Sequence, residues 1–191
     1  MGVAVSKLVP QYASLSDMQA WAADVMTRGP DFIIGDDYLR RWWIVPRSGF
    51  ANVYLHQIRH SDDDRAMHDH PWANTSVLIA GRYIEHTVDG VFLRQAGDVV
   101  ERTAETLHRL ELIDDEPAVS LFITGPKSRE WGFACPQGWV HWADFTDPAN
   151  PGQPGKGCGD YELVGGGGLG LISAGTRSAA SAAKGITGNE R

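Results

Sequence analysis

The middle of the chain alternates between hydrophobic and polar positions in short runs, a period of two that is typical of half-buried strands. Runs of this kind, or short apolar runs beside them, occupy residues 52–59, 76–86, 99–102, 107–113 and 119–124. Asp89-Gly90 is typical of a tight hairpin turn. Because no helical stretch separates the runs, the pattern predicts an all-β domain over residues 35–146, an antiparallel sandwich or barrel.

The two ends of the chain depart from this pattern. Ser16 and Gln19 are typical of a capping box, apolar positions at helical spacing follow, and Gly29-Pro30 ends the run. We therefore expect an N-terminal extension, residues 1–34, with a short amphipathic helix over 16–28.

Residues 147–191 hold 12 of the chain's 22 glycines, together with many alanines and serines. Such a composition buries too little apolar surface to offset the entropy lost on ordering. The sequence therefore predicts a flexible Gly-rich C-terminal tail.

The composition limits the classes of molecule that this protein is expected to bind. The net charge is −7 and no basic cluster is present, which argues against nucleic-acid binding. No apolar run approaches the ~18 residues of a transmembrane helix, so no membrane partner is expected. Cys135 and Cys158 are too few for a disulfide framework, and a cytoplasmic location is the expectation. The aromatic segments 131–133 and 139–145 either pack the last strand against the barrel or form the face of a homodimer.

Three histidines carry the candidate chemistry. His68 and His70 are two positions apart, so on a strand their imidazoles leave the same face. His108 lies in another alternating run, and if the two strands face each other across a barrel, the three rings converge. Neutral imidazole is the commonest side-chain ligand of transition metals. The alternative is that His68 and His70 are solvated in a loop beside the acidic turn 62–64.

The spacing around these histidines resembles the two motifs of the cupin superfamily, G(X)5HXH(X)3,4E(X)6G and G(X)5PXG(X)2H(X)3N. Every spacing is kept from His68 to Gly81 and from Gly97 to His108. Several residue types differ. In the first motif, Asp62 stands in place of the first Gly and Asn74 in place of the Glu. In the second motif, Thr103 stands in place of the Pro, Glu105 in place of the Gly and Leu112 in place of the Asn.

The resemblance covers roughly residues 35–146 and implies a cupin jelly-roll β-barrel. It also implies that His68, His70 and His108 are metal ligands, whereas the amide of Asn74 is a weaker ligand than the usual carboxylate. More loosely, residues 54–145 resemble uncharacterised cupin proteins of bacteria and phages that share an HDHPW core and a late Trp-Gly-Phe segment. This looser resemblance implies no particular activity.

The metal is not identified by the sequence. Three neutral nitrogens leave the full +2 charge and up to three open positions on an octahedral ion. Some cupin thiol dioxygenases hold Fe(II) with three histidines, so the resemblance keeps iron among the candidates, beside zinc, nickel and manganese. Asn74, His56 and Trp72 are the candidates for contacts to the ligands or to a substrate. Core packing is the alternative for Trp72, and a core or surface position is the alternative for His56.

These observations favour a metal-binding cupin that acts on a small molecule, with dioxygenase-type chemistry as the first hypothesis. The alternatives are a non-catalytic cupin that binds a small molecule, and a structural or accessory protein, phage-associated, in which the metal only stabilises the barrel.

Overall fold

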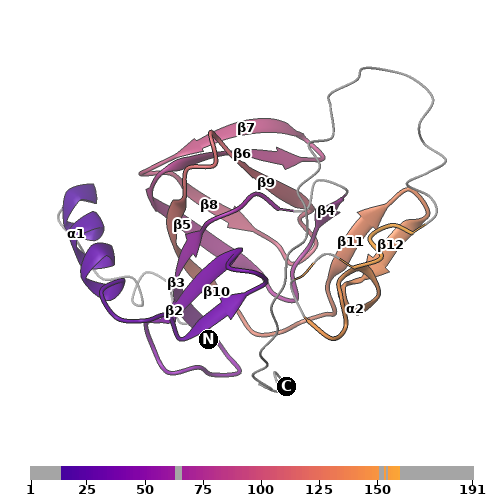
Figure 1. Ribbon diagram of the computed structural model, residues 1–191, viewed down its shortest axis with the longest axis horizontal. Helices are drawn as coiled ribbons and strands as arrows, with labels where there is room; N and C mark the ends of the chain where they lie inside the picture. Colours follow the sequence, from indigo (N-terminus) through magenta and orange to yellow (C-terminus); the bar gives the residue numbers. More distant parts are fainter. Residues whose placement is uncertain (1–13, 63–65, 151–152, 154, 160–191) are drawn as a thin grey trace.

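The computed structural model describes residues 14–62, 66–150, 153 and 155–159, and its strands form two six-stranded antiparallel sheets (Figure 1). The first sheet has the order β1 (Phe32–Ile34), β2 (Leu39–Trp43), β3 (Asn52–Ile58), β10 (Ala118–Thr124), β5 (Asn74–Ala80), β8 (Val99–Arg102). The second has the order β12 (Gly138–His141), β11 (Gly132–Cys135), β4 (Met67–His68), β9 (His108–Leu112), β6 (Arg82–Thr87), β7 (Gly90–Gln95).

Strand pairing identifies the architecture. Strand β3 pairs with β10, β4 with β9, β5 with β8, and β6 with β7. Each pair is nested inside the previous one, as when a long hairpin is folded over into two facing sheets, which is the jelly roll. The fold is therefore all-β and of the cupin, or double-stranded β-helix, type, as the sequence predicts.

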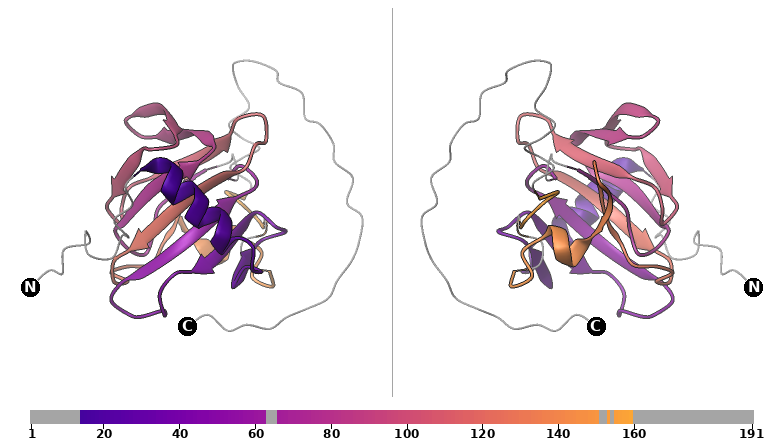
Figure 2. Two further views of the ribbon diagram at one scale, coloured as in Figure 1. Left: turned by 90° about the vertical axis from the view of Figure 1, so that its left-hand side faces the viewer. Right: turned by 90° about the vertical axis from the view of Figure 1, so that its right-hand side faces the viewer.

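Helix α1 (Leu15–Val25) packs on the outer face of the first sheet, where Ala22 contacts a cluster that includes Trp42, Leu55 and Leu121 (Figure 2). Its N-cap is Ser14, two residues earlier than the sequence predicts, because the Ser14 hydroxyl accepts a hydrogen bond from the Asp17 amide. None of the helices in the described part of the chain is long and apolar enough to cross a bilayer.

Two kinds of side chain fill the space between the sheets. One part is apolar and joins residues of both sheets in a single cluster: Leu39, Ile58, Leu78, Tyr83, Leu112 and Ala118. Buried polar side chains occupy another part, among them His56, Asn74, Glu85, Arg102 and His108. Apolar packing thus stabilises one part of the interior, while the buried polar groups of the other part need hydrogen bonds or ions as partners.

The single run predicted over residues 76–86 is two strands, because the chain turns at Gly81. This glycine has φ +78°, and a Cβ there would lie 2.6 Å from the carbonyl oxygen of Pro117. The run continues on both sides of this one glycine, and an isolated glycine within a strand pattern does not by itself mark the end of a strand.

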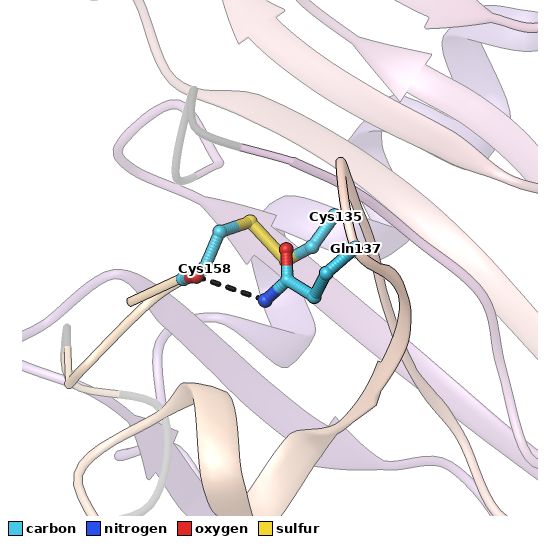
Figure 3. Close-up of a disulfide and its surroundings, with 3 residues drawn as sticks. All are labelled: Cys135, Gln137 and Cys158. Atoms are coloured by element: carbon cyan, nitrogen blue, oxygen red, sulfur yellow. Dashed lines mark hydrogen bonds between the residues drawn. A yellow bond between two sulfur atoms is a disulfide. The ribbon is translucent and has the colours of Figure 1, made fainter. Parts of the chain in front are cut away.

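The segment after β12 differs from its sequence interpretation. Cys135 lies in β11, and although two cysteines make no framework, a disulfide joins it to Cys158 (Figure 3). The Gln137 side chain donates to the carbonyl of Cys158, and the Gly157 amide donates to the carbonyl of Phe145 in α2 (Trp142–Phe145). The predicted tail therefore begins with residues that are fixed to the barrel, and the rest of it, residues 160–191, lies outside the described residues.

The late aromatic residues include both buried and exposed side chains. Phe133 and Phe145 stack with centroids 3.7 Å apart in a buried cluster that also contains both cysteines, so this segment packs the last strands against the barrel. Trp139 is 45% exposed.

Candidate metal centre

The structure brings His68, His70 and His108 together. One ring nitrogen of each lies within 4.8 Å of the others, and the Nε2 atoms of His70 and His108 are 2.9 Å apart. His108 is buried, while His68 and His70 are half-buried, so the cluster lies inside the barrel but is open on one side.

The way in which the rings meet differs from the expectation of two strands facing across the barrel. His68 and His108 are direct partners on β4 and β9, which are neighbours in one sheet. Strand β4 ends at His68, so His70 lies in the following loop, where its amide donates to the carbonyl of Ala104. The loop, rather than the strand's period of two, carries the second imidazole to the cluster.

A buried carboxylate orients His108. Its Nδ1 lies 3.1 Å from Oε1 of Glu85, which leaves the lone pair of a neutral ring on Nε2, the nitrogen that faces His70. Arg102 donates to the same carboxylate oxygen from Nε at 2.8 Å, and Arg94 donates to the other oxygen at 2.7 Å. Glu85 is 1% exposed, so this ion cluster forms a rigid support behind His108.

Asp62 has the corresponding place beside His68, with Oδ2 3.7 Å from Nδ1. The same oxygen accepts from the Leu110 amide at 2.7 Å, and Oδ1 accepts from the Tyr38 hydroxyl. Asp62 is 9% exposed, so this first residue of the acidic turn is buried beside the histidines. Residues 63 and 64 of that turn lie outside the described residues.

Asp69 fixes the segment between the two first histidines. Its carboxylate accepts from the Gly132 amide at 2.7 Å, from the Trp139 indole at 3.0 Å and from Arg129. These partners lie in β11, in β12 and just before β11, so the histidine loop is fastened to the last strands of the second sheet.

Burial keeps the rings of His68 and His70 neutral. Desolvation lowers the pKa of His68 to about 4, although Asp62 partly opposes this, and desolvation lowers the pKa of His70 well below its usual range. Burial would raise the pKa of Glu85, but hydrogen bonds from His108 and Arg102 and the charge of Arg102 hold it at about 2. At neutral pH His68 and His70 are therefore uncharged imidazoles, and Glu85 beside His108 is an ionised carboxylate.

Aromatic side chains wall the cluster. The Trp72 indole stacks on His70 with centroids 5.2 Å apart, and Phe122 lies 6.0 Å from the same ring. His56 lies one ring further away, 4.9 Å from Phe122, and its Nε2 accepts a hydrogen bond from Arg41. Trp72 thus contacts the cluster directly, whereas Phe122 separates His56 from it.

Asn74 occupies the position at which the resemblance places a carboxylate ligand. It is 4% exposed, and neither its Oδ1 nor its Nδ2 has a hydrogen-bond partner among the described residues. A buried amide without partners costs free energy. Both polar atoms of this amide are therefore available to a polar group in the barrel interior.

The donor set fits a divalent transition metal ion. Three neutral imidazoles suit iron, nickel, zinc and related ions, and the supporting carboxylates Glu85 and Asp62 are the kind of outer partner that ligating histidines have. Iron, zinc, nickel and manganese, the four ions named from the sequence, are all compatible with these donors.

Two surface depressions lie elsewhere. One of about 550 Å³ is lined by Met67, His86 and Arg109 among others, and one of about 340 Å³ runs beside Arg94 and Arg102 with Glu85 in its wall. None of the three clustered histidines lines either of them.

Sequence reasoning missed Glu85 and Arg102, and also Thr124, a buried residue of β10 whose hydroxyl has no hydrogen-bond partner among the described residues. A usable signal exists for the first two, because each is a charged residue at an inward position of an alternating strand, where an apolar side chain is expected. Thr124 carries no such signal, since threonine is common in strands.

The sequence matches neither a protein-family model nor a curated protein. Several solved structures are similar in fold. A cupin-2 domain protein from Rhodospirillum rubrum has a TM-score of 0.45 and 12% identity, over 53% of this chain and 68% of that one. A DMSP lyase from Ruegeria pomeroyi has a TM-score of 0.46 and 15% identity, over 64% of this chain and 70% of that one. An uncharacterised double-stranded beta-helix protein from Klebsiella pneumoniae has a TM-score of 0.42 and 16% identity, over 65% of this chain and 97% of that one. These are distant likenesses of fold alone.

Proposed function

We propose that His68, His70 and His108 bind one divalent transition metal ion and that the protein is a metal-dependent enzyme acting on a small molecule. The observation that carries the proposal is the convergence of three imidazole nitrogens within 4.8 Å. A bound ion would polarise substrate oxygens or activate O₂, chemistry that needs coordination positions not taken by protein.

The chain's own residues support such a role. Glu85 orients the His108 ring through a hydrogen bond, and the Asp62 carboxylate lies 3.7 Å from Nδ1 of His68. Trp72 and Phe122 exclude water from one side of the cluster, while the half-buried His68 and His70 leave a way in from outside. An ion held by three neutral nitrogens keeps open positions, and this favours chemistry over a purely structural role.

Dioxygenase-type chemistry is the specific form we propose, since a three-nitrogen centre leaves room for both O₂ and a substrate on Fe(II). A purely structural ion is the second candidate. It is favoured by the position of the two surface depressions, neither of which reaches the histidines.

The test is elemental analysis of protein purified without added metal, followed by cobalt(II) loading. We expect about one ion per chain, and we expect imidazole to change the visible spectrum of the cobalt(II) form by occupying an open position. His108→Ala, His68→Ala and His70→Ala should each lose the ion, whereas the exposed His60→Ala should keep it. Full metal content in His108→Ala would refute the site, and a cobalt spectrum insensitive to imidazole would favour the structural role.

A further inference from the structure

Asn74 and Thr124 place three polar atoms in the barrel interior that bond no other described residue: Oδ1 and Nδ2 of Asn74 and Oγ1 of Thr124. The two residues are direct partners on β5 and β10, so their side chains leave the same face side by side. They are 4% and 1% exposed. Leaving such groups unbonded is costly, so the pair suits a polar ligand.

The pair adjoins the histidine cluster. On one side, Asn74 is the cross-strand partner of Arg102, which binds Glu85 and through it His108. On the other side, Thr124 follows Phe122 by two positions on the same strand face, and the Phe122 ring lies 6.0 Å from His70. The two neighbours of the pair therefore lead to two of the three imidazoles, those of His108 and His70.

The charges around the cluster favour an anion. Among the described residues, the carboxylates of Asp69 and Glu85 are matched by ion pairs with Arg129, Arg94 and Arg102. Asp62 beside His68 is the remaining carboxylate, so these side chains sum to zero. Three neutral imidazoles and the amide of Asn74 add no negative charge. A divalent ion in this cluster would thus keep its two positive charges for a ligand to neutralise.

We infer that the ligand of this site is a small carboxylate, or a compound with a similar anionic oxygen group, and that Asn74 and Thr124 hydrogen-bond it beside the metal. The inference rests on the proposed function, because the ion supplies the attraction. A carboxylate has acceptor positions for the Asn74 amide, the Thr124 hydroxyl and the ion together. It also explains the amide at position 74, since a carboxylate side chain there would repel the ligand.

The probe is glycolate, with its neutral amide glycolamide as counterpart, titrated into cobalt(II)-loaded protein and followed by the visible spectrum and by calorimetry. We expect glycolate to bind at least about tenfold more tightly than glycolamide. Asn74→Asp should bind cobalt(II) more tightly and glycolate about tenfold more weakly, because its added charge opposes the anion. Metal content is measured after each titration.

Thr124→Val should weaken glycolate binding several-fold with unchanged cobalt(II) affinity, and Thr124→Ser should restore it by restoring the hydroxyl. The matched control is Thr75→Val, on the outward face of the same strand as Asn74, which should bind glycolate as the wild type does. If cobalt(II) does not bind, the proposed function fails. If cobalt(II) binds but glycolate is not preferred, or Asn74→Asp and Thr124→Val bind it as the wild type does, the inference is overturned and the metal site stands.

Discussion

His68 and His108 lie directly opposite each other on the antiparallel strands β4 and β9, with ring centroids 4.8 Å apart. Opposite residues of neighbouring strands have Cβ atoms roughly 5 Å apart and point to the same side. The ladder between the two strands therefore sets the separation of two of the three imidazoles, and only His70 depends on the conformation of a loop.

Glu85 should control metal affinity through His108. In Glu85→Gln the side chain keeps its shape but loses its charge, so it holds the ring less firmly and leaves Arg94 and Arg102 without their partner. We expect metal affinity to fall about 10- to 100-fold, measured by competition with a chromophoric chelator.

The control for this variant is Glu101→Gln, which changes an exposed carboxylate on β8 and should leave the affinity unchanged. Circular dichroism of both proteins shows whether the barrel is intact. Wild-type affinity in a folded Glu85→Gln protein would mean that the carboxylate is not needed to orient His108.

The strand pattern and the histidine spacing predict much of this arrangement, because alternation indicates which side chains share a face and the motif indicates which histidines belong together. Alternation does not give register. Glu85 meets His108 because β6 lies beside β9, a pairing of residues 23 positions apart that no local pattern reveals. Similarly, nothing local to Cys135 shows that residue 158 returns to it.

Acid should destabilise the metal-free protein through His56. Burial, with a smaller effect of the Arg41 charge, lowers the pKa of this ring well below 6.5 in the folded state. The unfolded chain then binds more protons as the pH falls below about 6.5, so the stability that is complete above this pH is lost below it. In urea unfolding at pH 7.5, 6.5 and 5.5 with a chelator present, His56→Leu should show a shallower decline than the wild type.

Removal of the Arg41 acceptor lowers the stability of His56→Leu at every pH, so the slope with pH, and not the absolute value, is the readout. His60→Leu is the matched control, because His60 is exposed on the same stretch of chain. Equal slopes in wild type and His56→Leu would show that His56 is not held neutral.

The Cys135–Cys158 disulfide should stabilise the barrel. It closes a loop of 23 residues, for which the chain-entropy model gives about 3 kcal/mol. A reducing agent should lower the thermal midpoint of the wild type and leave the Cys135→Ser/Cys158→Ser double variant unaffected. If reductant has no effect on the wild type, the two sulfurs are not joined in the purified protein.

Truncations separate the docked residues from the rest of the C-terminal segment. Deletion of residues 150–191 removes Cys158 and the Gly157 contact to Phe145, so it should cost about as much as reduction does. Deletion of residues 160–191 keeps both contacts and should leave the thermal midpoint within a few degrees. Equal losses in the two truncated proteins would show that residues beyond 159 also stabilise the barrel.

Gly81 should be required for backbone reasons alone. Its φ of +78° is disfavoured for residues with a Cβ, by about 1–2 kcal/mol, and that Cβ would also lie 2.6 Å from the Pro117 carbonyl oxygen and 2.9 Å from Cα of Ala118. Gly81→Ala should therefore lower the free energy of unfolding by about 2 kcal/mol or more in urea. Gly29→Ala is the control, since a Cβ there meets nothing within 4 Å and should be tolerated. The turn at Gly81 leads into β6, which carries Glu85, so a folded Gly81→Ala protein should also bind metal less tightly. Equal stability of the two alanine variants would show that β5 and β6 can be joined without the left-handed turn.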